Sequence, residues 1–307
     1  MQVAMIGLGR MGMNMARVLL EKGHDVVGYN RTAQKTKDLA REGAVAAPTL
    51  EDVAGLLDAP RAVWMMLPAG SAVDEHLERL LGVLSPGDIL VDGGNSFFKD
   101  SVRRAQKAQE AGILFVDAGV SGGIWGRTEG YCLMLGGLRG AVDRLEPLLR
   151  SLAPEDGFIH CGASGAGHFV KMIHNGIEYA MMQAYAEGFE LMEASPYAEN
   201  LDYARLSRVW NRGSVIRSWL LELAERVFSE DPDLSHIQGY VEDSGEGRWA
   251  VQQAVEEGVP SPVLTLSLFE RFRSRRENTF SNRVLAALRR EFGGHPVREA
   301  GTKKDSR

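Results

Sequence analysis

The sequence has few cysteines, no long apolar run and no excess of positive charge. The two cysteines, Cys132 and Cys161, lie in no Cys-x-x-Cys or other metal-ligand spacing, which argues against a disulfide scaffold and a cysteine-bound metal site. No segment approaches the roughly 20 consecutive apolar residues that a membrane helix needs. The formal net charge of -6 gives no overall attraction to nucleic acid or to an anionic membrane surface. An anionic ligand must therefore be bound by local basic groups.

The chain begins with an apolar, strand-like run over residues 2–7, and this start lacks the basic leader and long apolar core of a signal peptide. We therefore expect a cytoplasmic protein that binds neither membranes nor nucleic acid. With 307 residues, 44% of them hydrophobic, the chain exceeds the usual size of a single core and favours two domains.

The two halves of the chain differ in their pattern. Short strand-like runs alternate with helical patterns in the first half, as in a parallel sheet with helices on its faces, and long helical patterns dominate from His168 onward. We predict a Rossmann-type, doubly wound α/β domain over residues 1–162 and an all-α domain over residues 163–307. The predicted strands cover residues 3–6, 25–29, 62–67, 89–92, 114–117, 132–135 and 158–161. The predicted helices include residues 13–22, 74–84, 100–111, a long helix over 169–194, and 202–209, 215–228, 247–257, 261–276 and 281–292.

A G-x-G-x-x-G pattern, Gly7-Leu8-Gly9-Arg10-Met11-Gly12, follows the first predicted strand and opens a helix. Gly7 allows a tight turn, Gly9 lets the backbone approach a pyrophosphate, and Gly12 lets helix and strand pack closely. Three glycines alone would equally suit a flexible turn, but the strand–turn–helix context favours a bound dinucleotide.

The end of the second predicted strand bears on the choice of cofactor. Where NAD enzymes usually carry an acidic residue, this chain has Asn30-Arg31-Thr32. Arg31 offers a planar fork of donors that suits a 2′-phosphate, and Thr32 can add a hydroxyl. A solvent-exposed arginine at a helix start is the alternative. The pattern favours NADP without excluding NAD, and Leu67 and Asn95, near the ends of later strands, are further candidate cofactor contacts.

Two further motifs fall where the ligand crevice is expected. Residues 117–123 follow a predicted strand, and Ser121, Gly122 and Gly123 could present N–H groups and a hydroxyl to a carboxylate, although an ordinary glycine-rich loop also fits. Lys171, Asn175 and Glu178 stand at i, i+4 and i+7 of a predicted helix, with His174 on the same side. An exposed polar stripe is the alternative for this face, but the apolar, glycine-rich surroundings favour a packed helix.

These motifs together resemble a known group of enzymes. The glycine-rich turn with the later Ser-Gly-Gly and Lys-x-x-x-Asn elements resembles the β-hydroxyacid dehydrogenase superfamily. His174-Asn175-Gly176-Ile177-Glu178-Tyr179 is similar to the signature of the 6-phosphogluconate dehydrogenase family, and residues 92–96 and 292–295 agree with it. The likeness covers nearly the whole chain, whose length resembles the short form with one copy of the helical unit.

The resemblance implies oxidative decarboxylation of 6-phosphogluconate to ribulose 5-phosphate and carbon dioxide, a reaction of the pentose phosphate pathway. It implies that neutral Lys171 accepts the C3 hydroxyl proton during oxidation and that the protonated lysine then polarises the C3 carbonyl. Glu178 would protonate C1 of the resulting enediol. No metal is implied, because the lysinium supplies the electron sink.

The resemblance also implies substrate contacts in both domains. The carboxylate would be held by Ser121, Gly122 and Gly123, the hydroxyls and C3 by Asn95, His174 and Asn175, and the phosphate by Tyr179 and Arg248. Arg289 and His295 match residues that reach the neighbouring subunit's site, so a homodimer or homotetramer is implied. Arg271 is a weaker candidate for the phosphate, since the cluster over 271–276 also fits an exposed basic stripe.

The chain departs from the pattern of the long form in two places. Near the expected phosphate, Arg248 replaces a lysine and Ala250 replaces a threonine, so a cation is kept and a hydroxyl is lost. The arginine that follows in the family has no unambiguous counterpart within residues 271–276.

Two other functions remain open at this point. A non-decarboxylating dehydrogenase of the 3-hydroxyisobutyrate type would use Lys171 and Ser121, but Glu178 and the element around His295 argue against it. A catalytically silent cofactor-binding protein is disfavoured by the joint presence of the lysine, the asparagine and the glutamate.

Overall fold

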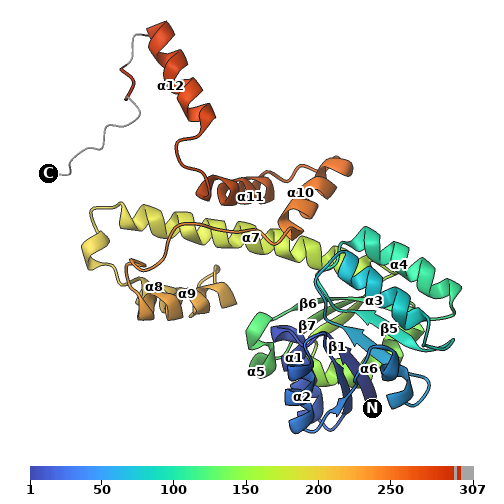
Figure 1. Cartoon of the computed structure of the whole chain (residues 1–307). Helices are drawn as coiled ribbons and strands as arrows, with labels where there is room; N and C mark the ends of the chain where they lie inside the picture. Colours follow the sequence, from blue (N-terminus) through green and yellow to red (C-terminus); the bar gives the residue numbers. More distant parts are fainter. Residues whose placement is uncertain (294–295, 299–307) are drawn as a thin grey trace. The chain divides into compact units, whose positions relative to one another are not determined.

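The computed structural model describes residues 1–293 and 296–298 and divides into two compact units. The first unit comprises Met1–Glu178 with Gly245–Val259, and the second comprises Tyr179–Ser244 with the described residues from Pro260 onward. Figure 1 labels the α-helices and some of the strands.

The first unit contains an eight-stranded sheet in the order β3-β2-β1-β4-β5-β6-β7-β8. Its strands are β1 (Gln2–Ile6), β2 (Asp25–Tyr29), β3 (Val45–Ala46), β4 (Ala62–Met65), β5 (Ile89–Asp92), β6 (Leu114–Ser121), β7 (Cys132–Gly137) and β8 (Phe158–Gly162). Neighbouring strands are parallel except β6 and β7, which are antiparallel. The strand order reverses direction at the β1–β4 boundary, and in open α/β sheets ligands bind at the carboxyl ends of the strands beside such a reversal.

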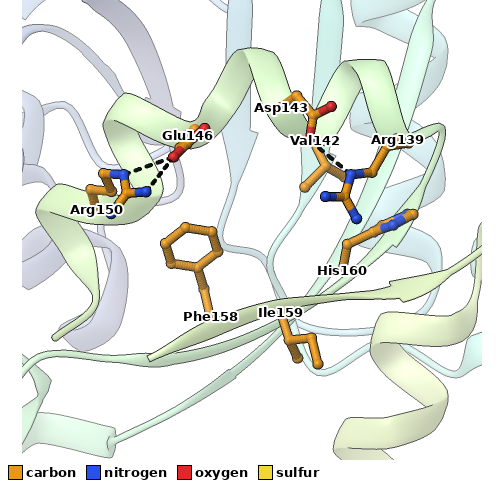
Figure 2. A pocket seen from close by; sticks show the side chains of 8 residues that line it. All are labelled: Arg139, Val142, Asp143, Glu146, Arg150, Phe158, Ile159 and His160. Atoms are coloured by element: carbon orange, nitrogen blue, oxygen red, sulfur yellow. Dashed lines mark hydrogen bonds and ion pairs between the residues drawn. The ribbon is translucent and has the colours of Figure 1, made fainter. Parts of the chain in front are cut away.

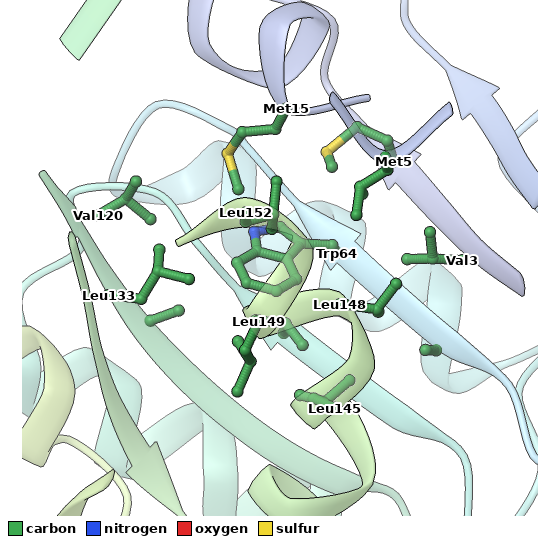
Figure 3. Close-up of a cluster of buried hydrophobic side chains, with 14 of the residues drawn as sticks. Val3, Met5, Met15, Trp64, Val120, Leu133, Leu145, Leu148, Leu149 and Leu152 are labelled. Carbon is green, nitrogen blue, oxygen red and sulfur yellow. The ribbon is translucent and has the colours of Figure 1, made fainter. Parts of the chain in front are cut away.

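Helices cover both faces of the sheet because successive residues of the central strands alternate between two apolar clusters. In β1, Val3 and Met5 join one cluster and Ala4 and Ile6 join the other. Leucines of α6 and residues of α1 fill the first cluster around Trp64 (Figure 3). Leucines of α3 fill the second. The helical elements of this part of the unit are α1 (Arg10–Glu21), α2 (Ala33–Arg41), η1 (Glu51–Leu56), α3 (Ser71–Leu81), α4 (Phe98–Glu110), η2 (Gly123–Trp125), α5 (Gly126–Glu129) and α6 (Arg139–Leu152).

Helices joined by loops make up the rest of the described chain. The elements are α7 (Ala166–Glu193), η3 (Ala198–Asn200), α8 (Tyr203–Trp210), α9 (Trp219–Glu230), α10 (Glu246–Glu256), α11 (Pro262–Ser274) and α12 (Phe280–Gly293). In the second unit, Phe189 packs against Tyr203, Trp210 and Phe228 and so joins α7 to α8 and α9. Within the described residues, no helix combines the length and the apolar character needed to cross a membrane.

The predicted fold class, a doubly wound α/β sheet followed by helices, is confirmed. Two details were wrong: β7 runs antiparallel to β6, and the predicted helix over 215–228 begins only at Trp219, because Ser218 caps it by accepting a hydrogen bond from Leu221 N at 3.2 Å. α6, which has Pro147 inside it, is not among the helices named from the sequence. The domain boundary at residue 162 stays a prediction.

Candidate active site

The glycine-rich turn between β1 and α1 is shaped for close backbone packing. Gly7 has a φ of +92°, and a Cβ atom there would lie 2.5 Å from Met66 O. A Cβ on Gly12 would overlap Gly7 O, whereas Gly9 is exposed and faces open space. Gly9 is also the N-cap of α1, and no side chain caps this helix. The first turn of α1 therefore fits the pyrophosphate of a dinucleotide, which it would bind through backbone N–H groups.

The residues after β2 divide into one that supports this turn and two that face solvent. Asn30 Oδ1 accepts a hydrogen bond from Leu8 N at 2.9 Å, and Asn30 Nδ2 donates to Thr32 O at 3.2 Å. Arg31 and Thr32 are exposed, and the Thr32 side chain does not cap α2. In the part of the chain that the structure describes, the Arg31 side chain has no polar partner. Arg31 and Thr32 are therefore available to a ligand.

The loops after β4 and β5 pack against each other at the same edge of the sheet. A Cβ on Gly94 would overlap Leu67 O, so only glycine allows this approach. Asp92, at the end of β5, accepts hydrogen bonds from Gly94 N at 3.2 Å and from Ser96 Oγ at 2.8 Å. These bonds hold the loop that presents the exposed side chain of Asn95.

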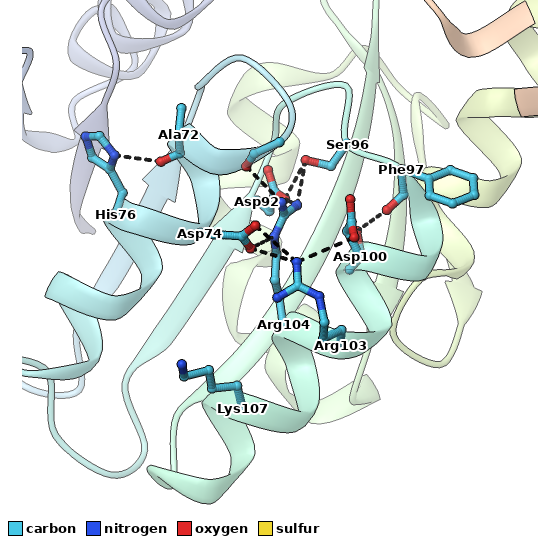
Figure 4. Close-up of polar contacts among 12 residues, drawn as sticks. Ala72, Asp74, His76, Asp92, Ser96, Phe97, Asp100, Arg103, Arg104 and Lys107 are labelled. Atoms are coloured by element: carbon cyan, nitrogen blue, oxygen red, sulfur yellow. Dashed lines mark hydrogen bonds and ion pairs between the residues drawn. The ribbon is translucent and has the colours of Figure 1, made fainter. Parts of the chain in front are cut away.

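Arg104 of α4, which the sequence did not single out, ties these loops together (Figure 4). Its side chain is fully buried and donates to Asp92 Oδ2 at 3.1 Å, to Asp74 Oδ1 at 2.8 Å and to Gly70 O at 3.1 Å. Burial raises the pKa of Asp74, but hydrogen bonds from Arg104 and Arg103 outweigh this and hold that pKa below its usual value. The loops after β4 and β5 are thus held by a buried ionic network.

Alternate residues of β6 contact the start of α7 through hydrogen bonds and close packing. The buried Asp117 carboxylate accepts hydrogen bonds from Gly165 N at 2.6 Å and His168 N at 2.9 Å, and so caps the helix. A Cβ on Gly119 would overlap Lys171 Cβ. Ser121 follows on the same side of β6. The sequence-based expectation of a loop over 117–123 was wrong in its first part, because β6 continues to Ser121.

Lys171 is buried with only 6% of its surface exposed. Burial lowers the pKa of its ammonium group, while the negative charges of Glu178 and Glu246 and the Cys132 thiol oppose that shift. A lowered pKa is the condition under which this lysine can accept a proton near neutral pH.

A chain of polar contacts runs beside Lys171. Ser121 Oγ lies 3.4 Å from His174 Nε2, and His174 Nδ1 lies 3.0 Å from Asn175 Oδ1. Asn175 Nδ2 donates to Glu246 Oε1 at 3.0 Å. Glu178 Oε2 lies 3.9 Å from His174 Nδ1. The structure therefore brings the predicted helix face and Ser121 together and adds Glu246, which sequence reasoning missed.

The other predicted substrate contacts fall in several places. Gly122 and Gly123 follow β6 with φ values of +119° and +53°. In the second unit, the Arg271 guanidinium lies 3.4 Å from the centre of the Tyr179 ring, so these two candidates lie together. Arg248 of α10 and Arg289 of α12 are exposed. His295 lies outside the described residues.

A cavity of about 300 Å³ lies between α6 and β8 (Figure 2). Its arginines are already paired, Arg139 with Asp143 and Arg150 with Glu146. None of the predicted site residues lines it. This cavity is separate from the candidate active site.

The fold, the dinucleotide turn and the buried lysine define a nicotinamide-dependent dehydrogenase. Residues 2–165 match the family model described as the NAD binding domain of 6-phosphogluconate dehydrogenase, and residues 167–304 match the model of its C-terminal domain. The chain therefore belongs to the 6-phosphogluconate dehydrogenase family.

Individual relatives agree with this assignment. The chain is 45% identical over 299 residues to an NAD(+)-dependent, decarboxylating 6-phosphogluconate dehydrogenase of Haloferax volcanii, covering 97% of this chain and 98% of the relative. The solved 6-phosphogluconate dehydrogenase of Plasmodium falciparum is similar with a TM-score of 0.81 and 28% identity, over 99% of this chain and 67% of that one. A 3-hydroxyisobutyrate dehydrogenase of Mycobacterium tuberculosis is more distant, with a TM-score of 0.70 and 25% identity over 94% of this chain and 99% of that one.

Proposed function

We propose that the protein oxidises and decarboxylates 6-phosphogluconate, giving ribulose 5-phosphate and carbon dioxide with reduction of a nicotinamide cofactor. The observation that carries this proposal is the buried Lys171, which shares a helix face with Glu178 and stands against the strand that ends in Ser121. The chain's membership of the family supports it.

Lys171 acts twice in the proposed reaction. The bound cofactor supplies the acceptor for the hydride of C3. The neutral Lys171 Nζ takes the proton of the C3 hydroxyl, which its burial favours because the charged form is poorly solvated there. The resulting ammonium donates to the C3 carbonyl of the β-keto acid and stabilises the negative charge that develops when carbon dioxide leaves. Glu178 then gives a proton to C1 of the enediol.

The remaining predicted contacts complete the proposed substrate site. Ser121, Gly122 and Gly123 are proposed to hold the carboxylate, since the turn after β6 presents its backbone there. Asn95, His174 and Asn175 are proposed to order the hydroxyls. The phosphate is assigned to Tyr179, Arg248 and Arg271, which offer a hydroxyl and two guanidinium groups.

The function is tested by mixing the protein with 6-phosphogluconate and either cofactor while following absorbance at the reduced-nicotinamide band. We expect an increase that depends on the sugar acid phosphate. A flat trace with both NADP and NAD would overturn the proposal.

We further propose that NADP is the preferred cofactor. The support is Arg31, whose exposed side chain has no polar partner within the described residues, beside the uncapped start of α2. The Arg31→Asp variant is expected to raise the KM for NADP about 10- to 100-fold and to change the KM for NAD little, because one charge-assisted contact to a phosphate is replaced by repulsion. Lys37→Asp, on the exposed side of α2, is the control. An equal effect of Arg31→Asp on both cofactors would show that this residue does not recognise the 2′-phosphate.

A homo-oligomer, dimer or tetramer, is proposed as the working form, with Arg289 and His295 completing the neighbouring subunit's site. Helices α11 and α12 support this because they expose large apolar side chains, an arrangement typical of interaction surfaces. These side chains are Leu266, Phe269, Phe280, Leu285 and Leu288.

A further inference from the structure

We infer that Glu246 is a positioning residue of this site, whose carboxylate fixes the Asn175 amide and, through it, the His174 ring. The inference rests on the proposed function, because it concerns how the proposed catalytic groups are held. Glu246 lies 71 positions from Asn175 in the sequence, and its carboxylate reaches the helix face from α10.

The direction of each hydrogen bond follows from the chemistry of a carboxylate. Glu246 Oε1 can only accept, so the Asn175 group 3.0 Å away must be the amide Nδ2, which donates. The Asn175 carbonyl Oδ1 then faces His174 and accepts from Nδ1–H at 3.0 Å. In the neutral imidazole this leaves Nε2 without a proton, as an acceptor for the Ser121 hydroxyl at 3.4 Å. The buried carboxylate of Glu246 thus favours the Nδ1–H tautomer of His174, in the same sense as the Glu178 carboxylate 3.9 Å from Nδ1.

The burial of Glu246 strengthens its hydrogen bond to Asn175. Only 3% of its surface is exposed, and Asn175 is 8% exposed, so water competes poorly for either group. Glu246 is also the first residue of α10, where the partial positive charge of a helix N-terminus favours a carboxylate. Gly245, with a φ of +102°, makes the turn that places it there.

The charge of Glu246 also acts on Lys171. The ionisable groups that face this lysine are Glu178 on its own helix, Glu246 on α10 and the Cys132 thiol on β7. Burial favours the neutral amine, and the two carboxylates favour the ammonium. The proposed reaction needs the neutral amine first and the ammonium afterwards. The negative charge of Glu246 stabilises the ammonium that the decarboxylation step requires.

The test uses variants that separate hydrogen bonding from charge. Glu246→Gln keeps an oxygen that can accept from Asn175 but removes the charge, and Glu246→Ala removes both. Glu256→Gln is the matched control, since Glu256 lies on the same helix but is exposed and pairs with Lys99. The tautomer of His174 is read from imidazole ¹⁵N shifts, and protonation of Lys171 from the pH dependence of its acylation by acetic anhydride, measured by peptide mass spectrometry.

We expect Glu246→Ala to lower kcat about 10- to 100-fold, the range for losing a hydrogen bond to a charged group, and to mix the His174 tautomers. Glu246→Gln should keep the Nδ1–H tautomer, lose less activity, and shift the acylation midpoint of Lys171 to lower pH. If Glu246→Ala does not fold, Glu246→Gln alone decides through the acylation midpoint.

An unchanged acylation midpoint in Glu246→Gln, or an unchanged tautomer with wild-type kcat in Glu246→Ala, would overturn the inference. The tautomer and acylation readouts need no substrate, so they decide on Glu246 even if the wild-type protein fails to turn over 6-phosphogluconate.

Discussion

Replacing Lys171 by methionine is expected to lower turnover by about 10⁴-fold, the upper range for removing a group that transfers protons, while leaving the affinity for the cofactor unchanged. Methionine has a similar length and no amine, so it fills the space against Gly119 without supplying a base. Single-turnover kinetics and cofactor titration measure the two effects. Turnover close to wild type would remove Lys171 from the mechanism.

The same variant is expected to have a higher free energy of unfolding, because burying the charged amine of Lys171 destabilises the folded protein. Burial lowers the pKa of Lys171 in the folded protein, so the unfolded chain binds its proton more tightly. The resulting penalty is fully present below the folded pKa and disappears as the pH rises past the ordinary lysine value. The increase in the free energy of unfolding caused by Lys171→Met, measured by urea denaturation, should therefore be larger in neutral than in strongly alkaline solution. Lys107→Met, at an exposed ion pair on α4, should show neither effect.

Replacing Arg104 by methionine is expected to lower the free energy of unfolding by roughly 3–5 kcal/mol, the cost of leaving a buried partner charge unpaired. The Asp92 carboxylate is fully buried and would lose its guanidinium partner, and Asp74 and Gly70 O would lose a donor. Urea denaturation measures the change.

Arg103→Met is the matched control for this prediction. Arg103 also pairs with Asp74, but its side chain is 55% exposed, so about 0–1 kcal/mol is expected. Equal losses in the two variants would contradict the view that the buried network holds the loops after β4 and β5.

Much of the fold follows from local patterns in the sequence. The turn from Gly7 to Gly12 and the long helix around Lys171 were predictable because the residues that define them are neighbours in the chain. β3 was missed because it has only two residues, both exposed, which leave no apolar alternation to detect. The antiparallel direction of β7 depends on tertiary pairing and leaves no local signal.

The site was predictable where one helix face carries it. Lys171, His174, Asn175 and Glu178 needed only helical spacing to be grouped. Arg104 and Glu246 could not be predicted because their partners are distant in the sequence. Asp74 lies 30 positions from Arg104, and Asn175 lies 71 positions from Glu246. The alternation of Asp117, Gly119 and Ser121 was a local signal for one strand face, but the glycine-rich composition favoured a loop.

The most direct test of the proposed activity is the ratio of carbon dioxide released to cofactor reduced when 6-phosphogluconate is the substrate. The account predicts one carbon dioxide for each reduced cofactor, because the ammonium of Lys171 and the proton from Glu178 carry the β-keto acid through decarboxylation. Cofactor reduction without carbon dioxide, as in a dehydrogenase of the 3-hydroxyisobutyrate type, or no reduction at all would contradict it.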